Sequence, residues 1–392
     1  MLEETDRLFE CEYCRVKSYL QPRGYFRYLF PDNAPQNRDL VFFPYWRFKG
    51  LLFSCLPDGI RHRFVDVSHQ AIDNVLFPLS VGLRSQALKL RFVSPDAAGR
   101  FLKPTLGPQQ VLNRCIERFS VDLPPPILAQ AHIGDSTSLI YSPFYTDKKL
   151  FDAILNRAVS GNGREDVDLS GLDSAKARGA IHFLPTLCPH CGWDLTGRKD
   201  SLLLECKNCA AIYKPHHQGF KKLSVVHVPH KGDDLIYLPF WRIKADVTGI
   251  ELNSYADLIH AANLPRVPQS GMESIPFHFW SLAFKVRPQH FLRIGQAVTL
   301  SQPGGPLEPN LPPSRRHPIN LPLKEGVESL KMLLAGFLRP RQTLSARLPQ
   351  IKVTPRSYIL VYLPFHERHH ELVHPTLSLA INKNMLHHAR NL

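Results

Sequence analysis

Four cysteines in the middle of the chain have the spacing of a metal site. Cys188 and Cys191 form one Cys-x-x-Cys pair, and Cys206 and Cys209 form a second pair 14 residues further on. Each such turn can direct two thiolates at one centre, and two turns complete the tetrahedron that Zn²⁺ adopts in closed structural sites. Two pairs with matched spacing disfavour a redox dithiol and favour zinc over iron. We therefore expect these four side chains to bind one zinc ion.

The segment that carries these cysteines, residues 187–213, resembles a zinc ribbon. Pro189 and Gly192 suit the tight turn at the first pair, because glycine tolerates the backbone conformation that follows the second ligand. The resemblance implies a small β-sheet that is held by a structural zinc ion and displayed to nucleic acid or protein. It covers this segment alone and does not extend to the rest of the chain.

A third Cys-x-x-Cys pair, Cys11 and Cys14, matches only the second pair of the ribbon. It therefore represents half of a zinc site. Three interpretations remain open: cysteines kept for packing, a site completed by other residues or by a partner subunit, and a natural start further upstream. Cys55 and Cys115 lie in apolar runs, which is typical of buried core thiols.

A second candidate for metal chemistry is the sequence His370-Glu371-x-x-His374. It resembles the motif of zincin metalloproteases, in which both histidines bind zinc from one helical face and the glutamate activates water. Pro375 would disrupt such a helix, and the surrounding residues favour β-structure. We therefore keep a zinc metallohydrolase only as an alternative to a polar, histidine-rich turn.

Basic residues alternate with apolar ones in four short segments that we expect to be strands, so each segment directs two cations to one face. Like charges on one sheet are destabilising unless acids or a bound anion offset them. Such faces can hold nucleic acid, although salt bridges to distant carboxylates would also explain them. The candidate anion- or nucleic-acid-binding residues are Arg47, Lys49, Lys89, Arg91, Arg242, Lys244, Lys285 and Arg287.

The chain contains an internal repeat, which predicts a duplicated fold. A shift of 195 residues places the first cysteine pair on Cys206 and Cys209, with proline and tryptophan positions following in the same order. Two further matches lie out of step with that shift. The matched positions include Pro44 with Pro239, Trp46 with Trp241, residues 87–91 with 283–287, and residues 139–145 with 360–366.

Each half is expected to be a mainly antiparallel sheet packed with helices, so the predicted class is α+β. Apolar residues at helical spacing predict helices over residues 109–119 and 323–338. The Gly/Ser/Asp-rich residues 160–180 predict a linker. The expected organisation is a first half over residues 1–159, that linker, a zinc ribbon over 181–215 and a second half over 216–392.

An aromatic-x-Pro-aromatic motif occurs four times, over residues 42–45, 141–144, 237–240 and 362–365. Proline cannot donate to a β-ladder. The motif therefore predicts a strand that pairs up to the proline and then bends or becomes an edge. Its aromatic side chains are expected to fill the core.

Composition is that of an ordinary soluble protein, with 44% hydrophobic residues and no apolar run long enough for a membrane helix. The acidic start of the sequence is no signal peptide, and together with the cysteine usage it indicates the cytoplasm. The net charge is +14, and most of the excess falls in residues 180–392. That charge either supports solubility or favours an anionic partner.

These features together predict a non-catalytic zinc-ribbon scaffold or binding protein that engages an anionic or protein partner. One alternative is a nucleic-acid-binding protein that uses the ribbon and the basic strand faces. The other alternative is the metallohydrolase with His370, Glu371 and His374. The sequence indicates neither the oligomeric state nor the identity of the partner.

Overall fold

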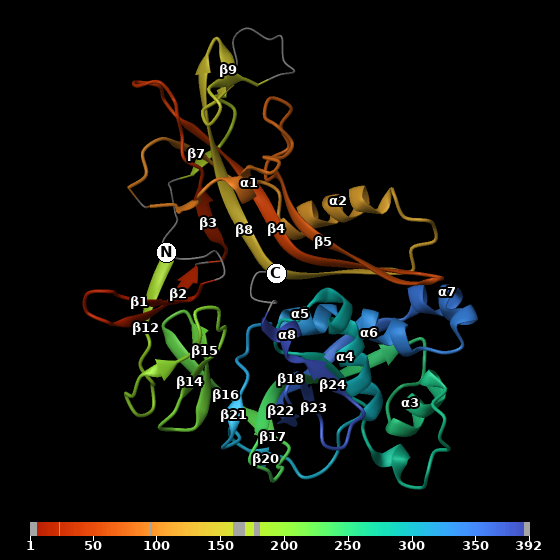
Figure 1. Cartoon of the computed structure of the whole chain (residues 1–392). Coiled ribbons are helices and arrows are strands. Elements are labelled where there is room, and N and C mark those ends of the chain that lie inside the picture. Colours follow the sequence, from red (N-terminus) through yellow and green to blue (C-terminus); the bar gives the residue numbers. More distant parts are fainter. Residues whose placement is uncertain (1–5, 23, 95, 160–168, 176–180, 388–392) are drawn as a thin grey trace.

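The computed structural model describes all residues except 1–5, 23, 95, 160–168, 176–180 and 388–392 (Figure 1). The described part of the chain combines four β-sheets with helices, so the predicted α+β class is confirmed. The sheets contain three, nine, four and eight strands. In the described part of the chain, no helix has the length and hydropathy that a membrane crossing requires.

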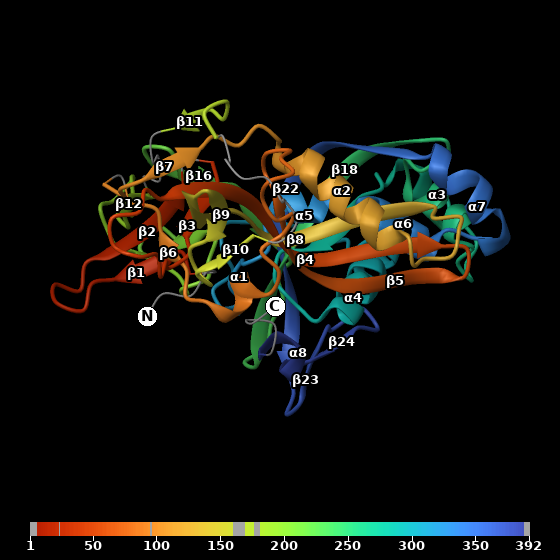
Figure 2. The ribbon, with the colours of Figure 1, turned by 90° about the horizontal axis from the view of Figure 1, so that it is seen from above.

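The nine-stranded sheet forms most of the first half, and its centre is a pair of long antiparallel strands. β4 (Val41–Leu56) pairs along almost its whole length with β8 (Ala129–Asp147), and a hairpin joins β4 to β5 (Gly59–Gln70). Helix α2 (Pro108–Ser120) lies against β4 and β5 (Figure 2). The other elements are β3 (Phe26–Leu29), α1 (Arg84–Ala87), β6 (Arg91–Phe92), β7 (Arg100–Leu102), β9 (Lys149–Asp152), β10 (Arg157–Ala158) and β11 (Ser174–Ala175).

The eight-stranded sheet forms the second half around another pair of long antiparallel strands. β18 (Leu235–Thr248) pairs antiparallel with β22 (Lys352–Glu367). Helices cover this sheet and fill the space between it and the first half (Figure 1). The other strands are β17 (Val225–His227), β19 (Phe279–Leu282), β20 (Glu308–Pro309), β21 (Arg315–Arg316), β23 (Glu371–Val373) and β24 (Ala380–Asn382). The helices are α3 (Tyr255–Ala262), α4 (Pro288–Ser301), α5 (Leu323–Glu328), α6 (Leu330–Phe337), α7 (Leu344–Arg347) and α8 (Lys383–His387), with 3-10 turns at Met272–Ser274, Arg341–Thr343 and Leu348–Gln350.

Two small sheets lie beside the halves. The three-stranded sheet combines the N-terminal strands β1 (Leu8–Glu10) and β2 (Lys17–Pro22) with β12 (Ile181–Pro185), which comes much later in the chain. The four-stranded sheet follows directly. Its strands are β13 (Leu195–Thr196), β14 (Leu204–Cys206), β15 (Ala211–His216) and β16 (Gly219–Leu223).

The two central strand pairs share one register. Pro44 lies opposite Tyr141 in the first half, and Pro239 lies opposite Tyr362 in the second half. Each pair has one register irregularity, directly after Lys49 and directly after Lys244. Each indole N–H of the matched tryptophans also donates to a leucine carbonyl just before a helix. These bonds run from Trp46 to Leu106 at 2.8 Å and from Trp241 to Leu321 at 3.2 Å.

The structure matches the residue after β5 with the residue after β19, which differs from the sequence alignment. The backbone N–H of Ala71 donates to the Pro44 carbonyl, and that of Ala283 donates to the Pro239 carbonyl. The structural counterpart of Ala283 is therefore Ala71, and the predicted alignment with Ala87 is wrong. The chain from Pro239 to Ala283 is longer than the chain from Pro44 to Ala71, because a segment containing α3 joins β18 to β19 whereas a tight hairpin joins β4 to β5. An alignment with few gaps could not detect that difference.

The predicted second basic strands are also largely wrong. Residues 88–90 lie between α1 and β6, so Lys89 is outside a strand, while Arg91 begins the two-residue β6. Lys285 and Arg287 lie between β19 and α4, which begins at Pro288. The alternation of basic and apolar residues therefore came from connecting segments, which have no fixed two-residue period.

All four prolines of the repeated motif lie where one neighbouring strand ends and another begins. Pro44 separates the part of β4 that pairs with β7 from the part that pairs with β5. Proline is tolerated there because it has no N–H to contribute to the interrupted side. Pairing on the other side is continuous and each strand keeps partners past its proline, so the predicted edge is wrong. The other switch points are Pro143 between β3 and β9, Pro239 between β21 and β19, and Pro364 between β17 and β23.

The two helices expected from periodicity are present. Residues 109–119 fall within α2, where Pro108 occupies the first turn and Val111 and Cys115 are buried against the sheet. Residues 323–338 form α5 and α6, which are separated at Ser329. The Ser329 hydroxyl donates to the Gly326 carbonyl at 2.7 Å, which is a bond that competes with regular helix hydrogen bonding.

The halves pack on each other through one continuous core. The ends of β4 and β8 reach the helices of the second half, where Phe53, Cys55 and Ile133 join its buried residues. The backbone N–H of Gly134 also donates to a Glu325 carboxylate oxygen at 2.6 Å. The described part of the expected linker, residues 169–175, does not span a gap. It packs on the first half through buried Leu169 and strand β11, and its remaining residues lie outside the described parts of the chain.

Candidate metal centre

The four predicted cysteines come together at one point of the four-stranded sheet. Cys188 and Cys191 lie in the turn before β13, while Cys206 ends β14 and Cys209 lies in the turn before β15. The register of the sheet brings the two turns together, because Leu195 of β13 lies opposite Cys206 of β14. All four sulfur atoms lie within 4.8 Å of one another.

The spacing of the sulfurs fits a tetrahedral ion. The Sγ atoms of Cys188 and Cys209 are 3.9 Å apart, and those of Cys191 and Cys206 are 3.6 Å apart. A zinc ion with Zn–S bonds of about 2.3 Å requires sulfur–sulfur edges of about 3.8 Å. The two distances bracket that value, so the four residues could hold one tetrahedral metal ion.

Backbone hydrogen bonds fix the turn that carries the first pair. The N–H of Cys188 donates to the Trp193 carbonyl at 2.8 Å, and the N–H of Gly192 donates to the Cys188 carbonyl at 2.9 Å. Gly192 has a φ of 72°, which a glycine adopts without steric cost. The second pair has the same feature, since Ala210 after Cys209 has a φ of 46°.

The thiols strongly influence one another. The pKa of Cys191 is lowered to about 6, first by a hydrogen bond from the Asn208 side chain and then by the backbone N–H of Trp193. The pKa of Cys209 is raised to about 12, chiefly by its hydrogen bond with Cys191. A cluster in which one thiolate forms readily and its neighbour resists ionisation favours a cation, which stabilises all four thiolates together.

Two residues beside the metal centre were not identified from the sequence. The Cys188 thiol donates to the Tyr213 hydroxyl at 3.3 Å, and the ring Nδ1 of His190 lies 3.5 Å from Cys209 Sγ. Hydrogen bonds to coordinating sulfurs tune and orient them. The only signal for these residues in the sequence is their proximity to the cysteines, which does not indicate the direction of a side chain.

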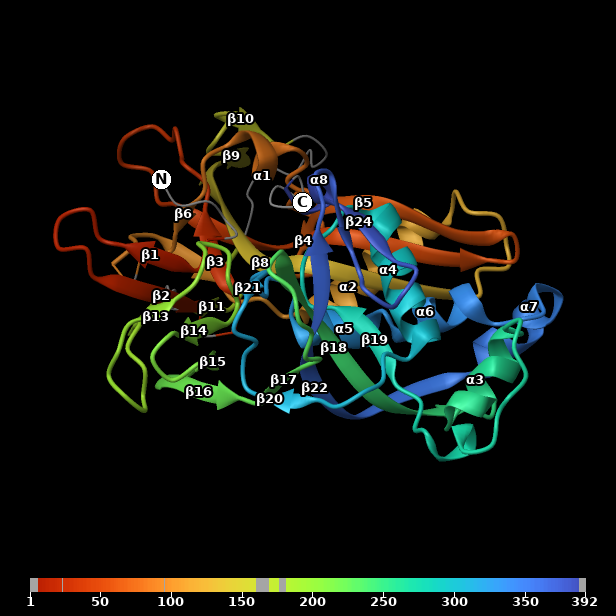
Figure 3. The same ribbon diagram turned by 60° about the horizontal axis from the view of Figure 1, so that its bottom comes forward.

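The four-cysteine cluster belongs to a packed unit that is built from distant segments. Its core includes Tyr19 from the N-terminal hairpin, whose ring contacts that of Phe220 at 6.0 Å between centroids. On the other side, the Asn320 side chain donates to Asp200 at 2.9 Å, and Arg316 forms an ion pair with Glu205. The four-stranded sheet therefore contacts both halves of the molecule (Figure 3).

Comparison with protein-family models, with curated proteins and with solved structures finds no match to this chain. The assignment of the centre therefore depends on its own geometry.

The eight basic residues predicted to bind an anion do not form one set. Arg47 is buried and forms a bidentate ion pair with Asp66, at 2.8 and 2.9 Å. Lys285 is also buried, and Arg242 is half-buried with its pKa lowered by desolvation. Lys49 is partly buried. The exposed members are Lys89, Arg91, Lys244 and Arg287.

The His370-Glu371-x-x-His374 segment is β-structure, as its sequence indicates. Glu371 begins β23, so the helix that would place both histidines on one face is missing. His370 is exposed, whereas His374 is buried and its Nδ1 accepts backbone N–H groups from Thr376 and Leu377 at 3.2 and 3.0 Å. Burial lowers the pKa of His374 to about 4.

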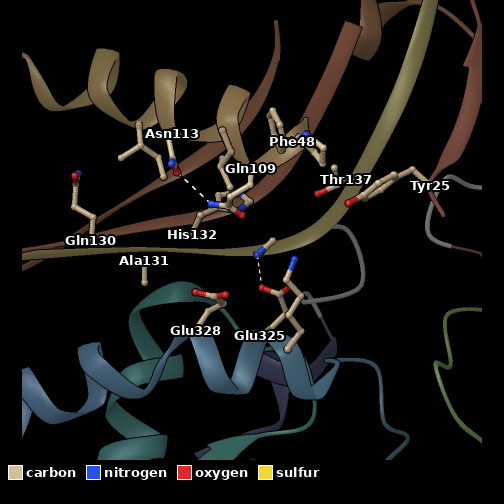
Figure 4. A pocket seen from close by; sticks show the side chains of 15 residues that line it. Tyr25, Phe48, Gln109, Asn113, Gln130, Ala131, His132, Thr137, Glu325 and Glu328 are labelled. Carbon is tan, nitrogen blue, oxygen red and sulfur yellow. Dashed lines mark hydrogen bonds between the residues drawn. The ribbon is translucent and has the colours of Figure 1, made fainter. Parts of the chain in front are cut away.

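A polar cavity of about 200 Å³ lies between the halves, where α2, β8 and α5 meet (Figure 4). His132 lines it, and burial followed by the charge of Lys324 lowers the pKa of this histidine to about 4. Glu325 contributes the carboxylate that accepts the Gly134 N–H, and Glu328 lies one helical turn further on. The sequence could not indicate this cavity, because Gly134 and Glu325 are 191 positions apart.

Proposed function

We propose that this chain is a non-catalytic, zinc-stabilised scaffold or binding protein. The observation that carries the proposal is the four-cysteine cluster, whose sulfur–sulfur distances of 3.6 and 3.9 Å suit tetrahedral Zn²⁺. Its four thiolates would fill every coordination position. Catalytic zinc sites instead have three protein ligands and keep one position for water or substrate.

The proposed role of the ion is to hold a zinc-ribbon-like sheet together. That sheet has few buried apolar residues of its own and packs against the N-terminal hairpin and the second half. Metal binding to such a site contributes directly to folding, because the unfolded chain has no preformed site. We infer that the ion thereby stabilises the region where the two halves and the hairpin meet.

Duplication of an ancestral half is part of the same proposal. The shared register around Pro44 and Pro239 supports it, as do the matched hydrogen bonds of Trp46 and Trp241. A scaffold made of two related sheets with an added metal element agrees with this arrangement.

The test compares two substitutions by metal analysis of the purified full-length protein. Cys188→Ser is expected to reduce bound zinc at the four-cysteine centre from about one ion per chain to near zero, because a three-thiolate site loses much of its affinity. His370→Ala is the matched control and should leave the zinc content unchanged. Loss of zinc in the histidine variant, or its retention in Cys188→Ser, would contradict the proposal.

A nucleic-acid partner is the second candidate, and one observation favours it. Lys214 on β15 lies directly opposite Lys221 on β16, and both side chains are exposed. Like charges in direct register destabilise a hairpin, so a bound polyanion would relieve the repulsion. This basic surface lies on the sheet that carries the metal centre.

Binding of single-stranded RNA or DNA to the full chain tests this candidate. The affinity should fall steeply with added salt, because phosphate contacts release counterions. The double variant Lys214→Glu/Lys221→Glu should bind more weakly and show a smaller salt slope, whereas Lys89→Glu outside this surface should behave like the wild type. Equal binding by all three proteins would exclude the β15–β16 surface.

A further inference from the structure

The turn that carries Cys11 and Cys14 has the same backbone structure as the metal-centre turns. The N–H of Cys11 donates to the Val16 carbonyl at 3.0 Å, and the N–H of Arg15 donates to the Cys11 carbonyl at 2.8 Å. Cys188 makes the same two bonds with residues at the same positions, at 2.8 and 2.9 Å. Arg15 also has a positive φ of 56°, as do Gly192 and Ala210 after the other pairs.

The hairpin around this turn matches one hairpin of the metal centre. In β1 and β2, Phe9 lies opposite Ser18. In β14 and β15, Leu204 lies opposite Tyr213, and both positions are displaced by 195 residues. Cys11 and Cys14 therefore occupy the positions of Cys206 and Cys209 in structure as well as in sequence. The N-terminal turn thus has the form of a metal-binding turn and not merely its spacing.

The sulfur of Cys11 is arranged as a metal ligand. Backbone N–H groups of Cys14 and Tyr13 hydrogen-bond to it. The equivalent N–H groups, those of Cys191 and His190, reach the sulfur of Cys188. Such donors stabilise a thiolate, which is the form that binds a metal.

This turn is accessible, and its two cysteines are two ligands short of a closed site among the described residues. Cys14 is exposed and Tyr13 beside it is 97% exposed. The β1–β2 turn extends away from the body of the molecule, as two views show (Figures 1 and 3). In the described ranges, the four-cysteine centre is the only group of three or more candidate metal ligands, so no third ligand meets Cys11 and Cys14 there.

We propose that Cys11 and Cys14 from two copies of this chain bind one Zn²⁺ ion and so bridge a homodimer. A closed zinc site requires four ligands, and a two-fold axis through the ion supplies them from two identical turns. The chain itself demonstrates that two such turns fit around one centre, since its internal pairs approach to 3.6 and 3.9 Å. Zinc displaces the thiol protons, which pass to the solvent.

The test is a zinc titration of the full-length protein, followed by light scattering for mass and by metal analysis. Moderate salt of about 0.15 M shortens the Debye length to about 8 Å and so screens the repulsion between two basic chains. The wild type should be a monomer with about one zinc ion per chain at limiting zinc, and a dimer with about 1.5 ions per chain when zinc is added. A chelator that leaves the internal ion in place should return it to monomer.

Matched variants distinguish the bridging site from the internal centre. Cys11→Ser/Cys14→Ser should remain monomeric with one ion per chain, whereas Tyr13→Ala, which changes the same turn but no ligand, should still dimerise. A wild type that stays monomeric in added zinc would overturn the proposal, as would a dimer that survives the double substitution. Loss of the internal ion in the double variant would instead show that the bridging site and the four-cysteine centre do not bind zinc independently. The internal centre is tested separately by Cys188→Ser.

Discussion

His132 is a partly buried histidine that lies between the two halves of the molecule. Its Nε2 is buried and has no hydrogen-bond partner among the described residues, and it lines the polar cavity with Lys324 and Glu325. The pKa of about 4 lies below the value of about 6.5 for a histidine in the unfolded chain. The folded protein therefore keeps this ring neutral at pH values where the unfolded chain protonates it.

This shift predicts a defined pH dependence of stability. The contribution of the neutral ring is complete above about pH 6.5 and is lost progressively as the pH falls towards about 4. His132→Gln removes the titrating group, so between about pH 7 and pH 5 the wild type should lose about 1–2 kcal/mol more than the variant. Urea denaturation at the two pH values measures the difference, and parallel losses in both proteins would contradict the prediction.

Single residues could be predicted from the sequence where their function depends on local spacing. The four cysteines of the centre were identified because the spacing within each Cys-x-x-Cys turn is enough to direct two sulfurs at one point. Arg47 was assigned to an anion-binding face, yet its partner Asp66 belongs to the next strand of the hairpin. A charge pattern within one strand cannot reveal a carboxylate supplied by its neighbour, so the sequence overstated the number of free cations.

The irregularity in β4 is an element whose local geometry depends on glycine. Gly50 has a φ of 151° and lies opposite Gly134 of β8. A Cβ at Gly50 would lie 2.5 Å from the Gly134 Cα and closer still to the Ile133 carbonyl oxygen. Backbone atoms on both strands would have to move to admit a side chain.

Gly50→Ala is therefore expected to destabilise the protein by about 2–4 kcal/mol, because it combines backbone strain with a backbone clash. Gly304→Ala is the control. That glycine is exposed, and the nearest atom to a new Cβ lies 3.9 Å away, so a change within about 0.5 kcal/mol is expected. Both values come from chemical denaturation, and a similar small change in both variants would show that the irregularity tolerates a side chain.

Regular elements with strong local signals could be predicted, and their connections could not. The period of apolar residues located α2 correctly, and it located α5 and α6 apart from the break at Ser329. The proline motif lies where one neighbouring strand is exchanged for another, but the edge that it predicted is wrong because the strands stay paired past the proline. The counterpart of Ala283 was missed because it depends on the length of a connection, and short sequence matches do not fix that length.

The whole molecule is one body that is joined in two places. Buried side chains from the ends of β4 and β8 share a core with the second half, and the metal-centre sheet contacts both the N-terminal hairpin and the second half. The expected division into a first half, a linker, a zinc ribbon and a second half does not predict these contacts. Sequence order shows which residues are neighbours along the chain, but β12 reaches β2 across about 160 positions.

That pairing of β12 with β2 sets an order of events during synthesis. The hairpin of β1 and β2 leaves the ribosome well before its partner strand, which is translated about 160 residues later. Until β12 is made, the backbone N–H and C=O groups along one edge of β2 have no strand to pair with. Such an unpaired edge readily pairs with other chains. A newborn chain of this protein is consequently most vulnerable to aggregation before β12 has been made.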